Sequence, residues 1–534
     1  MTPTLTPTRR GLFGLAAGLA SVSLAGPASA APKRGGKLIY GRYADSLELD
    51  PVYTDANVDI WVSGSIYDTL LLPTSDGMGV QPGLATKWAL SDGGKTLTLT
   101  LRAGVKFSDG TPLKASDVKW SLDRARDPKA GAWNDMIGSI GAVSVTAADT
   151  VVLKLKHPDP TILAALATFN TGILPQAAYE KTPGATDEEK AKKFAETPLG
   201  TGPFMMKEWK RNQVMRLVRN PHYWRAGADG KPLPYVDEIE FQIIPDDSTR
   251  ILKLKAGELH GSEFIPLARV KELQADPTLR MELWPSTKVT YLSMMVKPTL
   301  KSGAANPLSN QKVRQALNYA VNKDAVIAIT TLGLGAPMKS FMSSTTPLYD
   351  GVAPLYPFDM AKAKALLAEA GFAGGLELTC LTIAGNQDNL NNLTAVQQMW
   401  AAVGVKLTIE QMDNPSLVAK YRAEDFQMRT AAWTNDIADP GEITSYFAYG
   451  PNIHALHSGW DDKRVDELFL ASQQETDVAK RRAQYKEIQK IYNDAATIVP
   501  LYETPYTVAW RKNVTGFVQI PLGNNDFQSV TIGA

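Results

Sequence analysis

The sequence predicts an α/β protein built from two or three compact lobes. The chain has 534 residues, and about 500 remain once the leader described below is set aside, which exceeds the usual size of one domain. Runs in which apolar and polar residues alternate with period two predict strands, and segments with helical spacing of apolar residues separate several of them. In the second half, helix, glycine and strand recur in that order, which is typical of an α/β lobe.

The first thirty residues predict an export signal, a signal peptide over 1–30. Arg9-Arg10 precedes a mostly apolar stretch, 11–25, and Ala28-Ser29-Ala30 offers a site for a signal peptidase. The stretch is shorter and richer in small residues than a membrane span of about 20 apolar residues. The paired arginines resemble a twin-arginine signal, and ordinary secretory export stays the alternative. We therefore expect an exported protein in a periplasm-like space.

The single cysteine, Cys380, bears on both membrane anchoring and oxidation. A lipoprotein carries its lipid on a cysteine just after the leader, whereas here Ala31-Pro32-Lys33 follows, so we expect no lipid anchor. One cysteine cannot form an intramolecular disulfide. Cys380 shares a face of its predicted strand with Leu376 and Leu378, which predicts a buried and unreactive thiol.

The first half of the chain contains one clear strand–helix unit. Ser91-Asp92-Gly93-Gly94 predicts a tight turn, and the alternating run 96–101 predicts a half-buried strand. Ser116 is expected to cap a helix whose apolar side carries Val118, Leu122 and Ala125. The polar and charged segment 186–196 predicts a surface helix or a connection between lobes.

The second half follows the α/β pattern more regularly. Asp359 is expected to cap a helix that ends at Gly371, and the alternating strand 376–383 comes next. Another helix runs from about Asn392 to Gly404 and leads into a strand, 405–409. A long helix over 473–494, with Tyr485, Ile488 and Tyr492 on its inner face, precedes an apolar strand, 498–502.

Composition and motifs argue against several functions. The net charge is +1, without a basic stripe or an acidic tail, so nucleic acid is not an expected partner. Asp92–Thr96 ends like a phosphate-binding loop but has Ala89 in place of the first glycine and precedes a strand. No set of nucleophile, base and orienting residue assembles, so we expect no catalytic residues and no cofactor.

Two further pairs could mimic a metal site or a catalytic dyad. On a helix, His454 and His457 could share a metal ion, but Pro451 upstream and Ser458-Gly459 downstream predict a loop, so no metal site is expected. Asp246-Asp247 follows Pro245, which predicts a turn and then a helix cap.

The segment from Trp433 to Pro440 is the strongest candidate for a ligand site. It follows an expected strand, 426–432, at the point where the chain leaves the sheet, and ligands of α/β lobes lie at such strand ends. Trp433 offers a flat apolar face, and Asp436 offers a carboxylate that would need a cation as its partner in a closed cleft. The residues alone leave a second interpretation open, in which Asp436 caps a turn and Trp433 is core.

Several longer blocks resemble one family, the extracytoplasmic solute-binding proteins of ABC importers, family 5, which includes dipeptide, oligopeptide, glutathione and nickel binders. The blocks follow in family order and cover nearly the whole mature chain. They are Leu101–Leu113 with its continuation Ser116–Leu122, Gly200–Phe204, Arg219–Trp224, Lys312–Ala320 and the helix from Asp359 to Phe372. Their number and order identify the chain as a member of that family.

The resemblance implies a two-lobe periplasmic-binding-protein fold (type II, of the large cluster C kind) with an extra inserted subdomain and a two-strand hinge. It implies that the lobes close on a ligand, as in a venus flytrap, and present it to an importer. The expected limits are lobe I over 31–75, 195–285 and 501–534, an inserted subdomain over 76–194, and lobe II over 286–500.

In peptide-binding relatives, an aspartate in a Trp-x-x-Asp segment holds the α-ammonium group of the ligand. Trp433-Thr434-Asn435-Asp436 is similar to that segment, so the resemblance assigns the ammonium to Asp436 and flanking contacts to Trp433, Thr434 and Asn435. It places Asp55, Ala56 and Asn57, from the first lobe, near where dipeptide binders present backbone groups.

The chain departs from the family at the other end of the ligand. Dipeptide binders place an arginine ahead of the helix that here ends at Gly404, and this chain has Leu390 and Asn391 near that place. Some oligopeptide binders have an arginine three residues before the tryptophan, where this chain has Thr430, and Arg429 points to the other face of the strand. No arginine is therefore expected to clamp the ligand carboxylate.

The expected function is capture of a short peptide or peptide-like solute for the membrane permease subunits of an ABC transporter, by a monomer. The alternative keeps the same receptor role for a non-peptide solute such as an opine, a glycoside or a metal chelate. An envelope enzyme is disfavoured by the missing catalytic set, and a periplasmic chaperone or chemosensory adaptor is a further alternative.

Overall fold

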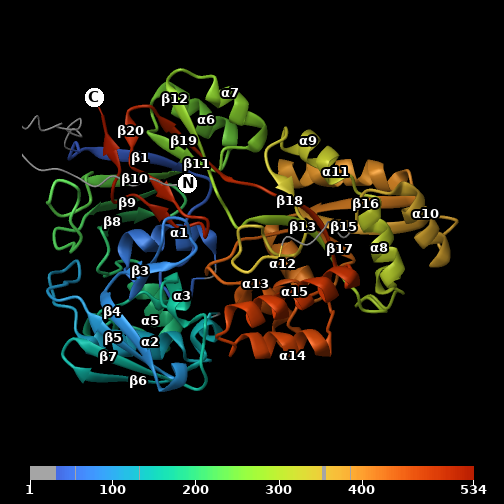
Figure 1. Cartoon of the computed structure of the whole chain (residues 1–534). Helices are drawn as coiled ribbons and strands as arrows, with labels where there is room; N and C mark the ends of the chain where they lie inside the picture. Colours follow the sequence, from blue (N-terminus) through green and yellow to red (C-terminus); the bar gives the residue numbers. More distant parts are fainter. Residues whose placement is uncertain (1–31, 55, 132, 351–355, 385, 534) are drawn as a thin grey trace, which may run out of the picture.

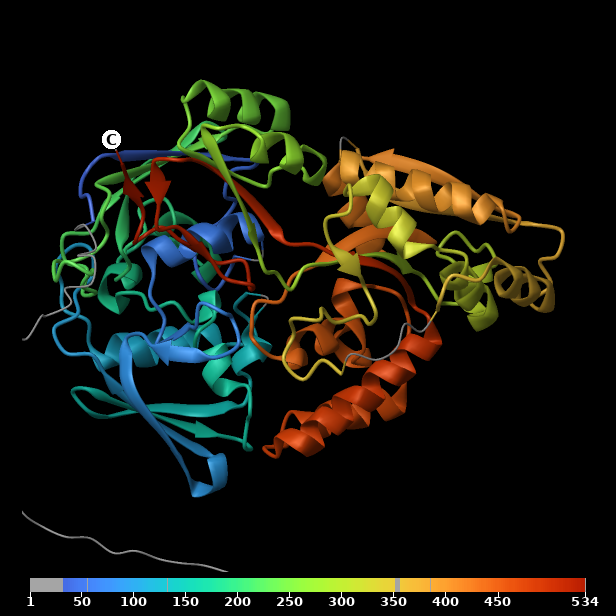
Figure 2. The same cartoon turned by 45° about the horizontal axis from the view of Figure 1, so that its top comes forward.

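The structure, a computed structural model, describes residues 32–533 apart from 55, 132, 351–355 and 385 (Figure 1). The expected signal peptide over 1–30 lies outside the described residues. Two large sheets form the centres of two lobes, which stand side by side in Figures 1 and 2. The chain is therefore a two-lobe α/β protein, as the sequence predicts. None of the described helices has the length and apolar character that a membrane crossing requires.

The first lobe is centred on a seven-stranded sheet with the strand order β12-β19-β11-β1-β10-β9-β8. Strand β1 runs parallel to both β10 and β11, whereas the other neighbouring pairs are antiparallel. The strands are β1 (Lys37–Arg42), β8 (Phe204–Lys210), β9 (Val214–Arg219), β10 (Glu238–Ile243), β11 (Gly261–Glu263), β12 (Leu279–Trp284) and β19 (Tyr506–Arg511). The accompanying helices are α1 (Asn57–Ile66), α6 (Asp247–Ala256) and α7 (Val270–Gln274).

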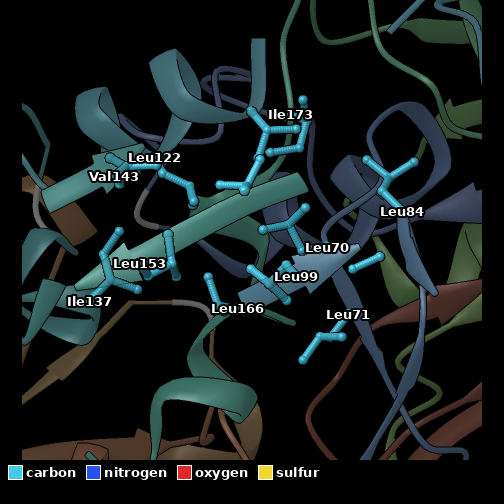
Figure 3. Packing of buried hydrophobic residues seen from close by; sticks show 14 of the residues in the cluster. Leu70, Leu71, Leu84, Leu99, Leu122, Ile137, Val143, Leu153, Leu166 and Ile173 are labelled. Carbon is cyan, nitrogen blue, oxygen red and sulfur yellow. The ribbon is translucent and has the colours of Figure 1, made fainter. Parts of the chain in front are cut away.

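A smaller unit inserted in the first lobe carries its own four-stranded antiparallel sheet, in the order β4-β5-β7-β6. Helix α2 packs on this sheet over a separate apolar core that includes Leu99, Leu122 and Leu153 (Figure 3). Its elements are β2 (Leu71–Pro73), β3 (Val80–Pro82), β4 (Ala85–Ser91), β5 (Thr96–Leu101), α2 (Ala115–Ala125), η2 (Asn134–Ile137), β6 (Ile140–Ala147), β7 (Thr150–Leu155), α3 (Ile162–Ala165), α4 (Gln176–Glu180) and α5 (Asp187–Phe194). We call this unit the subdomain.

The second lobe is centred on a six-stranded mixed sheet with the order β14-β18-β13-β17-β15-β16. One core joins this sheet to α8–α11, and another, around Tyr291, Phe447 and Tyr485, joins it to α13–α15. The strands are β13 (Val289–Met294), β14 (Ala336–Pro337), β15 (Leu376–Ile383), β16 (Val405–Met412), β17 (Met428–Trp433) and β18 (Ile498–Glu503). The helices are α8 (Gln311–Tyr319), α9 (Lys323–Thr330), α10 (Met360–Glu369), α11 (Gln387–Ala401), α12 (Asn414–Arg422), α13 (Pro440–Phe447), η6 (Gly450–Ala455), α14 (Lys463–Ser472) and α15 (Val478–Ala495).

Two chain segments connect the sheets of the two lobes. The chain passes from β12 to β13 and returns from β18 to β19. Strands β12 and β19 are neighbours in the first sheet, and β13 and β18 are neighbours in the second. Ser286 in the first crossing donates a hydrogen bond from its hydroxyl to the carbonyl of Thr504 in the second, at 2.5 Å. This is the expected two-strand hinge. Strand β18 continues to Glu503, beyond the expected limit of lobe II at 500, and the lobe limits stay predictions.

Most predicted elements are confirmed. Asp359 accepts a hydrogen bond from the backbone of Lys362 and caps α10, which Gly371 follows with a positive φ of 91°. Asp246 caps α6 in the same way, and Thr186 caps α5. Cys380 is fully buried, and this burial raises the pKa of its thiol, as expected of an unreactive cysteine.

Three predicted helix starts are wrong. Helix α2 begins at Ala115 after Lys114, whose backbone N–H is accepted by Asp117, so Ser116 lies inside the helix and does not cap it. Helix α11 begins at Gln387, because Asn386 caps it, and not near Asn392. The helix expected over 473–494 begins at Val478, since Asp477 caps it and 473 belongs to the end of α14.

Candidate ligand site between the lobes

A cavity of about 480 Å³ that opens to solvent lies between the subdomain and the second lobe. Figures 1 and 2 show α13 and α14 facing the subdomain across this seam. The lining residues of the subdomain follow β7 or surround η2, and those of the second lobe come from α13, η6 and α14. They include Asn134, Asp135, Ser139, His157 and Asp159 on one side and Ile437, Glu442, Tyr446, Asn452 and Phe469 on the other. We call this space the distal cavity.

A second cavity, of about 350 Å³, lies on the hinge side. Strand β17 contributes residues 429–432 to its wall, and the first lobe contributes Leu267. Arg429, expected to point away on the other face of the strand, therefore lines this cavity together with Thr430. Its polar lining also includes Lys288, Asp388, Tyr421 and Thr504. We call it the hinge cavity. The chain that leaves β17 continues through 433–437 to the distal cavity, so the predicted ligand segment connects the two spaces.

Asp436 is half-buried in the loop between β17 and α13. Its carboxylate forms no hydrogen bond or ion pair with any described residue, and burial raises the pKa of this carboxyl well above its ordinary range. The charge of Asp436 in turn helps to raise the pKa of Tyr506, which belongs to the first lobe, and of Tyr446. Asp436 therefore lies at the seam between the lobes, although it is not among the residues that line either cavity.

Glu442, in the first turn of α13, is the functional candidate that sequence reasoning missed. Its side chain is only 5% exposed, and its Oε2 atom accepts hydrogen bonds from the backbone N–H groups of Asp436 at 2.8 Å and Ile437 at 3.0 Å. Burial and the nearby Asp436 charge raise the pKa of Glu442. Its other oxygen, Oε1, has no hydrogen-bond partner among the described residues. Two carboxyls that lack a cation are thus held together at the seam.

The indole of Trp433 belongs to an aromatic group that crosses the seam. It lies 5.1 Å from the ring of Tyr446 and 5.7 Å from that of Phe447, measured between centroids. Tyr446 also meets Trp133 of the subdomain at 5.8 Å, edge to face. The indole N–H of Trp433 is buried and, within the described part of the chain, has no acceptor. Trp433 is therefore packed in the second lobe with one donor unused.

Thr434 and Asn435 have different surroundings. Thr434 is half-buried beside the hydroxyl of Tyr506 in the first lobe. Asn435 is fully buried, its backbone N–H donates to the hydroxyl of Thr287 at 2.9 Å, and its side-chain amide donates to Thr346 at 3.4 Å. Asn435 thus anchors the loop to the second lobe, whereas Thr434 stands at the seam.

Of the three residues predicted from the first lobe, Asp55 lies outside the described residues. Ala56 and Asn57 are half-buried at the start of α1, where the carbonyl of Ala56 accepts from the backbone of Asp59 and Ile60. Neither lines the distal or the hinge cavity. The preceding carbonyl, that of Thr54, accepts the indole N–H of Trp133 at 2.9 Å, which connects this segment to the aromatic group.

Lys288 is the second residue that sequence reasoning missed. It lines the hinge cavity and is half-buried, and burial lowers the pKa of its ammonium group, an effect that Asp388 opposes. No described carboxylate lies within ion-pair distance of it, and its Nζ atom lies 5.8 Å from the centre of the Phe264 ring. Leu390 and Asn391, at the place of the family's arginine, do not line this cavity, but Asp388 does. Its place in the sequence could have identified it as a candidate, because Lys288 directly precedes the hinge strand β13.

The described residues contain no group of three or more histidines, cysteines, aspartates or glutamates arranged to hold a metal ion. His454 lies in η6, and the ring of His457, beyond η6, packs 5.5 Å from that of Tyr421. Asp159 in the distal cavity is already satisfied by the hydroxyls of Ser139 and Thr161. The groups that the described part of the seam offers to a ligand are therefore charged side chains and aromatic rings.

Comparisons with known proteins agree with this architecture. The model of a family described as bacterial extracellular solute-binding proteins, family 5, matches residues 79–455. A dipeptide-binding protein of Escherichia coli strain K12 is 29% identical over 508 residues, which cover 89% of this chain and 92% of that protein.

Two solved structures share the fold over nearly the whole chain. A periplasmic binding protein, DppA, of Helicobacter pylori in complex with the peptide STSA has a TM-score of 0.81 and 26% identity, and the match covers 94% of this chain and 99% of that one. The protein AgaA of Agrobacterium in complex with agropinic acid has a TM-score of 0.79 and 25% identity, with 93% and 99% covered.

Proposed function

Because the chain belongs to family 5 of the bacterial extracellular solute-binding proteins, we propose that it is the receptor of an ABC importer for a short peptide or peptide-like solute. The ligand would lie between the lobes, and closure around it would present the complex to the membrane permease subunits. The named ligands of relatives support this proposal, since one relative is a dipeptide-binding protein and one solved structure holds the peptide STSA.

The observation that carries the proposal is the uncompensated negative charge of Asp436 and Glu442 at the seam. Burying a carboxylate is costly unless a cation or hydrogen-bond donors compensate it. Neither residue forms an ion pair with a described lysine, arginine or histidine, and burial raises the pKa of both. A ligand ammonium group placed between the lobes would supply the missing charge, which is the role assigned to Asp436.

The opposite charge at the hinge supports a ligand that also carries a carboxylate. Lys288 lines the hinge cavity without an ion-pair partner among the described residues, together with Thr430 and Asn386. Lys288 directly precedes β13, whose first residue, Val289, pairs with Trp433 at the end of β17, so the lysine lies near the start of the predicted ligand segment. A cation just before β13 and an ammonium site just after β17 fit a zwitterion, as a free peptide is. Lys288 would thus serve, together with Arg429 of the same cavity wall, in place of the arginine that relatives carry elsewhere.

The remaining parts of the proposal concern export and chemistry. The paired arginines and the Ala-Ser-Ala site support export with cleavage of residues 1–30, and the sequence after that site supports a protein without a lipid anchor. The binding proteins that match the chain support a role without catalysis. We propose that it acts as a monomer in the periplasm.

A second candidate keeps the receptor role but changes the ligand. The solved structure of AgaA contains agropinic acid and is as similar to this chain as the peptide complex is. A solute of that kind would use the same two charged ends. The distinction is therefore one of ligand chemistry within a single type of receptor.

Native mass spectrometry of the mature protein, purified from the periplasm of its own cells, tests the proposal. A stoichiometric ligand of peptide mass is expected, and a non-peptide mass would favour the second candidate. The Asp436→Asn variant is expected to lose the ligand, while Asp461→Asn, an exposed aspartate of the same lobe, retains it. A variant at 436 that keeps a full complement of ligand would refute the assigned role.

A further inference from the structure

We propose that Glu442, together with Asp135 across the seam, forms a second cation site in the distal cavity. This site would select ligands that carry an amine or guanidinium group in addition to the ammonium held by Asp436. The inference rests on the proposed function and deepens it, because it names the preferred ligand as a peptide whose first residue is lysine or arginine.

The first observation is an unsatisfied oxygen on a side chain that is more than nine-tenths buried. Glu442 lines the distal cavity and is 5% exposed. Its Oε2 atom holds the backbone N–H groups of Asp436 and Ile437, yet within the described part of the chain no donor reaches Oε1. A glutamine would hold the same two N–H groups without a buried charge. The charge itself is thus unexplained unless a ligand neutralises it.

The second observation is a carboxylate that approaches from the other lobe. Asp135, on η2, lines the same cavity, and its charge contributes to the raised pKa of Glu442. The amide of Asn452 donates both to Asp135 at 3.2 Å and to Ser445 at 2.6 Å, which bridges the seam beside α13. Lobe closure therefore completes the site, because one carboxylate comes from each side.

The other residues that line the distal cavity favour a cationic group over an anionic one. Among the described residues that line the distal cavity there is no lysine or arginine, and His157 is the only histidine. Asp159 is satisfied by Ser139 and Thr161, so it does not compete for the ligand. Tyr446, Tyr449 and Phe469 supply aromatic faces, which attract ammonium and guanidinium groups. Aromatic faces beside the carboxylates of Glu442 and Asp135 suit the long side chain of lysine or arginine.

The short distance between Asp436 and the second cation site indicates which class of ligand would bind. Glu442, on α13, is hydrogen-bonded to the backbone of Asp436 in the preceding loop, so the two residues lie close together and cannot bind distant parts of a ligand. Asp436 would take the α-ammonium group, and the side chain of the same first residue would enter the distal cavity. A peptide with a basic first residue satisfies both.

Isothermal titration calorimetry with Ala-Ala-Ala, Lys-Ala-Ala and Arg-Ala-Ala tests the inference. The full-length mature protein is expected to bind the two basic-first peptides at least about tenfold more tightly, because their side chain adds a charge-assisted contact. In Glu442→Gln, which keeps the backbone hydrogen bonds, that preference should fall below about threefold. Asp135→Asn should reduce it partly, and Glu467→Gln, an exposed glutamate on α14, should leave it unchanged.

The outcomes separate the two proposals. Binding of all three peptides with equal affinity would overturn the second site and leave the peptide receptor standing. An undiminished preference in Glu442→Gln would likewise overturn it, since the glutamate would then act only by holding the loop. Failure of every peptide to bind the unmodified protein would overturn the peptide proposal together with this inference.

Discussion

The Oε2 atom of Glu442 lies 2.8 Å from the backbone nitrogen of Asp436 and accepts a hydrogen bond from it. A side chain in the first turn of α13 thus fixes the loop that carries the predicted ligand-binding aspartate. The same contact keeps two acidic groups close together in the partly buried seam between the lobes, and burial raises the pKa of both. Without a ligand, this arrangement costs free energy, and the cost depends on pH.

The first prediction concerns the stability of the ligand-free protein. Asp436→Asn should raise the free energy of unfolding at pH 8 by about 1–2 kcal/mol, because it removes a buried charge whose pKa is raised, and each pKa unit corresponds to about 1.4 kcal/mol. The folded protein holds the proton of Asp436 more tightly than the unfolded chain does. The stability that this proton supplies is therefore lost as the pH rises from about 4 through the raised pKa.

Urea denaturation of ligand-free protein at pH 5 and pH 8 measures this effect. The gain of Asp436→Asn over the unmodified protein should be larger at pH 8 than at pH 5. Asp461→Asn, exposed in the same lobe, should show little gain at either pH. A variant at 436 that is less stable at pH 8 would show that the carboxylate is satisfied by the protein itself.

The second prediction concerns the pH dependence of binding. Affinity for a peptide with a free amine should rise between about pH 5 and 7, because the pair of Asp436 and Glu442 must lose its shared proton before it binds a cation. Affinity should fall again above about pH 8, where the α-amino group, with a pKa of about 7.7–8.0, loses its proton. Calorimetry at pH 6 in two buffers of different ionisation enthalpy should detect proton release. Proton uptake, or none, would contradict the shared proton.

The sequence predicts much of this fold because the determinants are local. Capping aspartates such as Asp359 and Asp246 need only the next three residues, and the alternating pattern of 376–383 reports one buried face. The helix starts near Ser116 and Gln473 were wrong because a neighbouring residue caps better: Asp117 satisfies the backbone before the first helix, and Asp477 caps the second. Such competition depends on backbone angles that a pattern does not contain.

The site was only half predictable for a different reason. Asp436 follows a recognisable tryptophan, so a segment of four residues identifies it. Glu442 and Lys288 become candidates only through what surrounds them, an oxygen without a donor and an ammonium without a carboxylate. Asp135 reaches the seam from the subdomain, about 300 residues earlier in the chain. Contacts between lobes are absent from any local pattern.

The third prediction tests Lys288 as the carboxylate partner. The unmodified protein should prefer a peptide with a free C-terminus over its C-terminal amide by about tenfold, the effect of one charge-assisted hydrogen bond. Lys288→Gln should lose most of that preference and should not be less stable, because burial already lowers the pKa of this lysine. Lys301→Gln, exposed in the same lobe, is the matched control. Equal affinity of the unmodified protein for acid and amide would remove Lys288 from the site.

The fourth prediction concerns closure. The side-chain amide of Asn452 joins the lobes through Asp135, and the neighbouring Tyr446 meets Trp133 across the seam. Asn452→Ala should reduce the closed population by about three- to tenfold, since one hydrogen bond is worth about 0.5–1.5 kcal/mol. Single-molecule fluorescence transfer between dyes on the two lobes measures that population. An unchanged distribution in Asn452→Ala would mean that the aromatic contact alone determines closure.

The last prediction distinguishes residues that stabilise the loop between β17 and α13 from residues whose charge binds the ligand. Asp439 accepts two hydrogen bonds from Arg481, at 2.5 and 2.7 Å, and also caps α13 through the backbone N–H of Gly441. Both side chains are buried, so Arg481→Met leaves Asp439 bare and should cost about 3–5 kcal/mol of unfolding free energy. The exposed neighbour gives the control, because Arg482→Met should change the free energy of unfolding by less than about 0.5 kcal/mol.

Urea denaturation measures the stability of both variants. The folded Arg481→Met protein should still discriminate amine-bearing peptides from N-acetylated ones, because Asp436 and Glu442 retain their charge. Loss of that discrimination in a folded variant would instead make the Asp439–Arg481 pair part of the binding site.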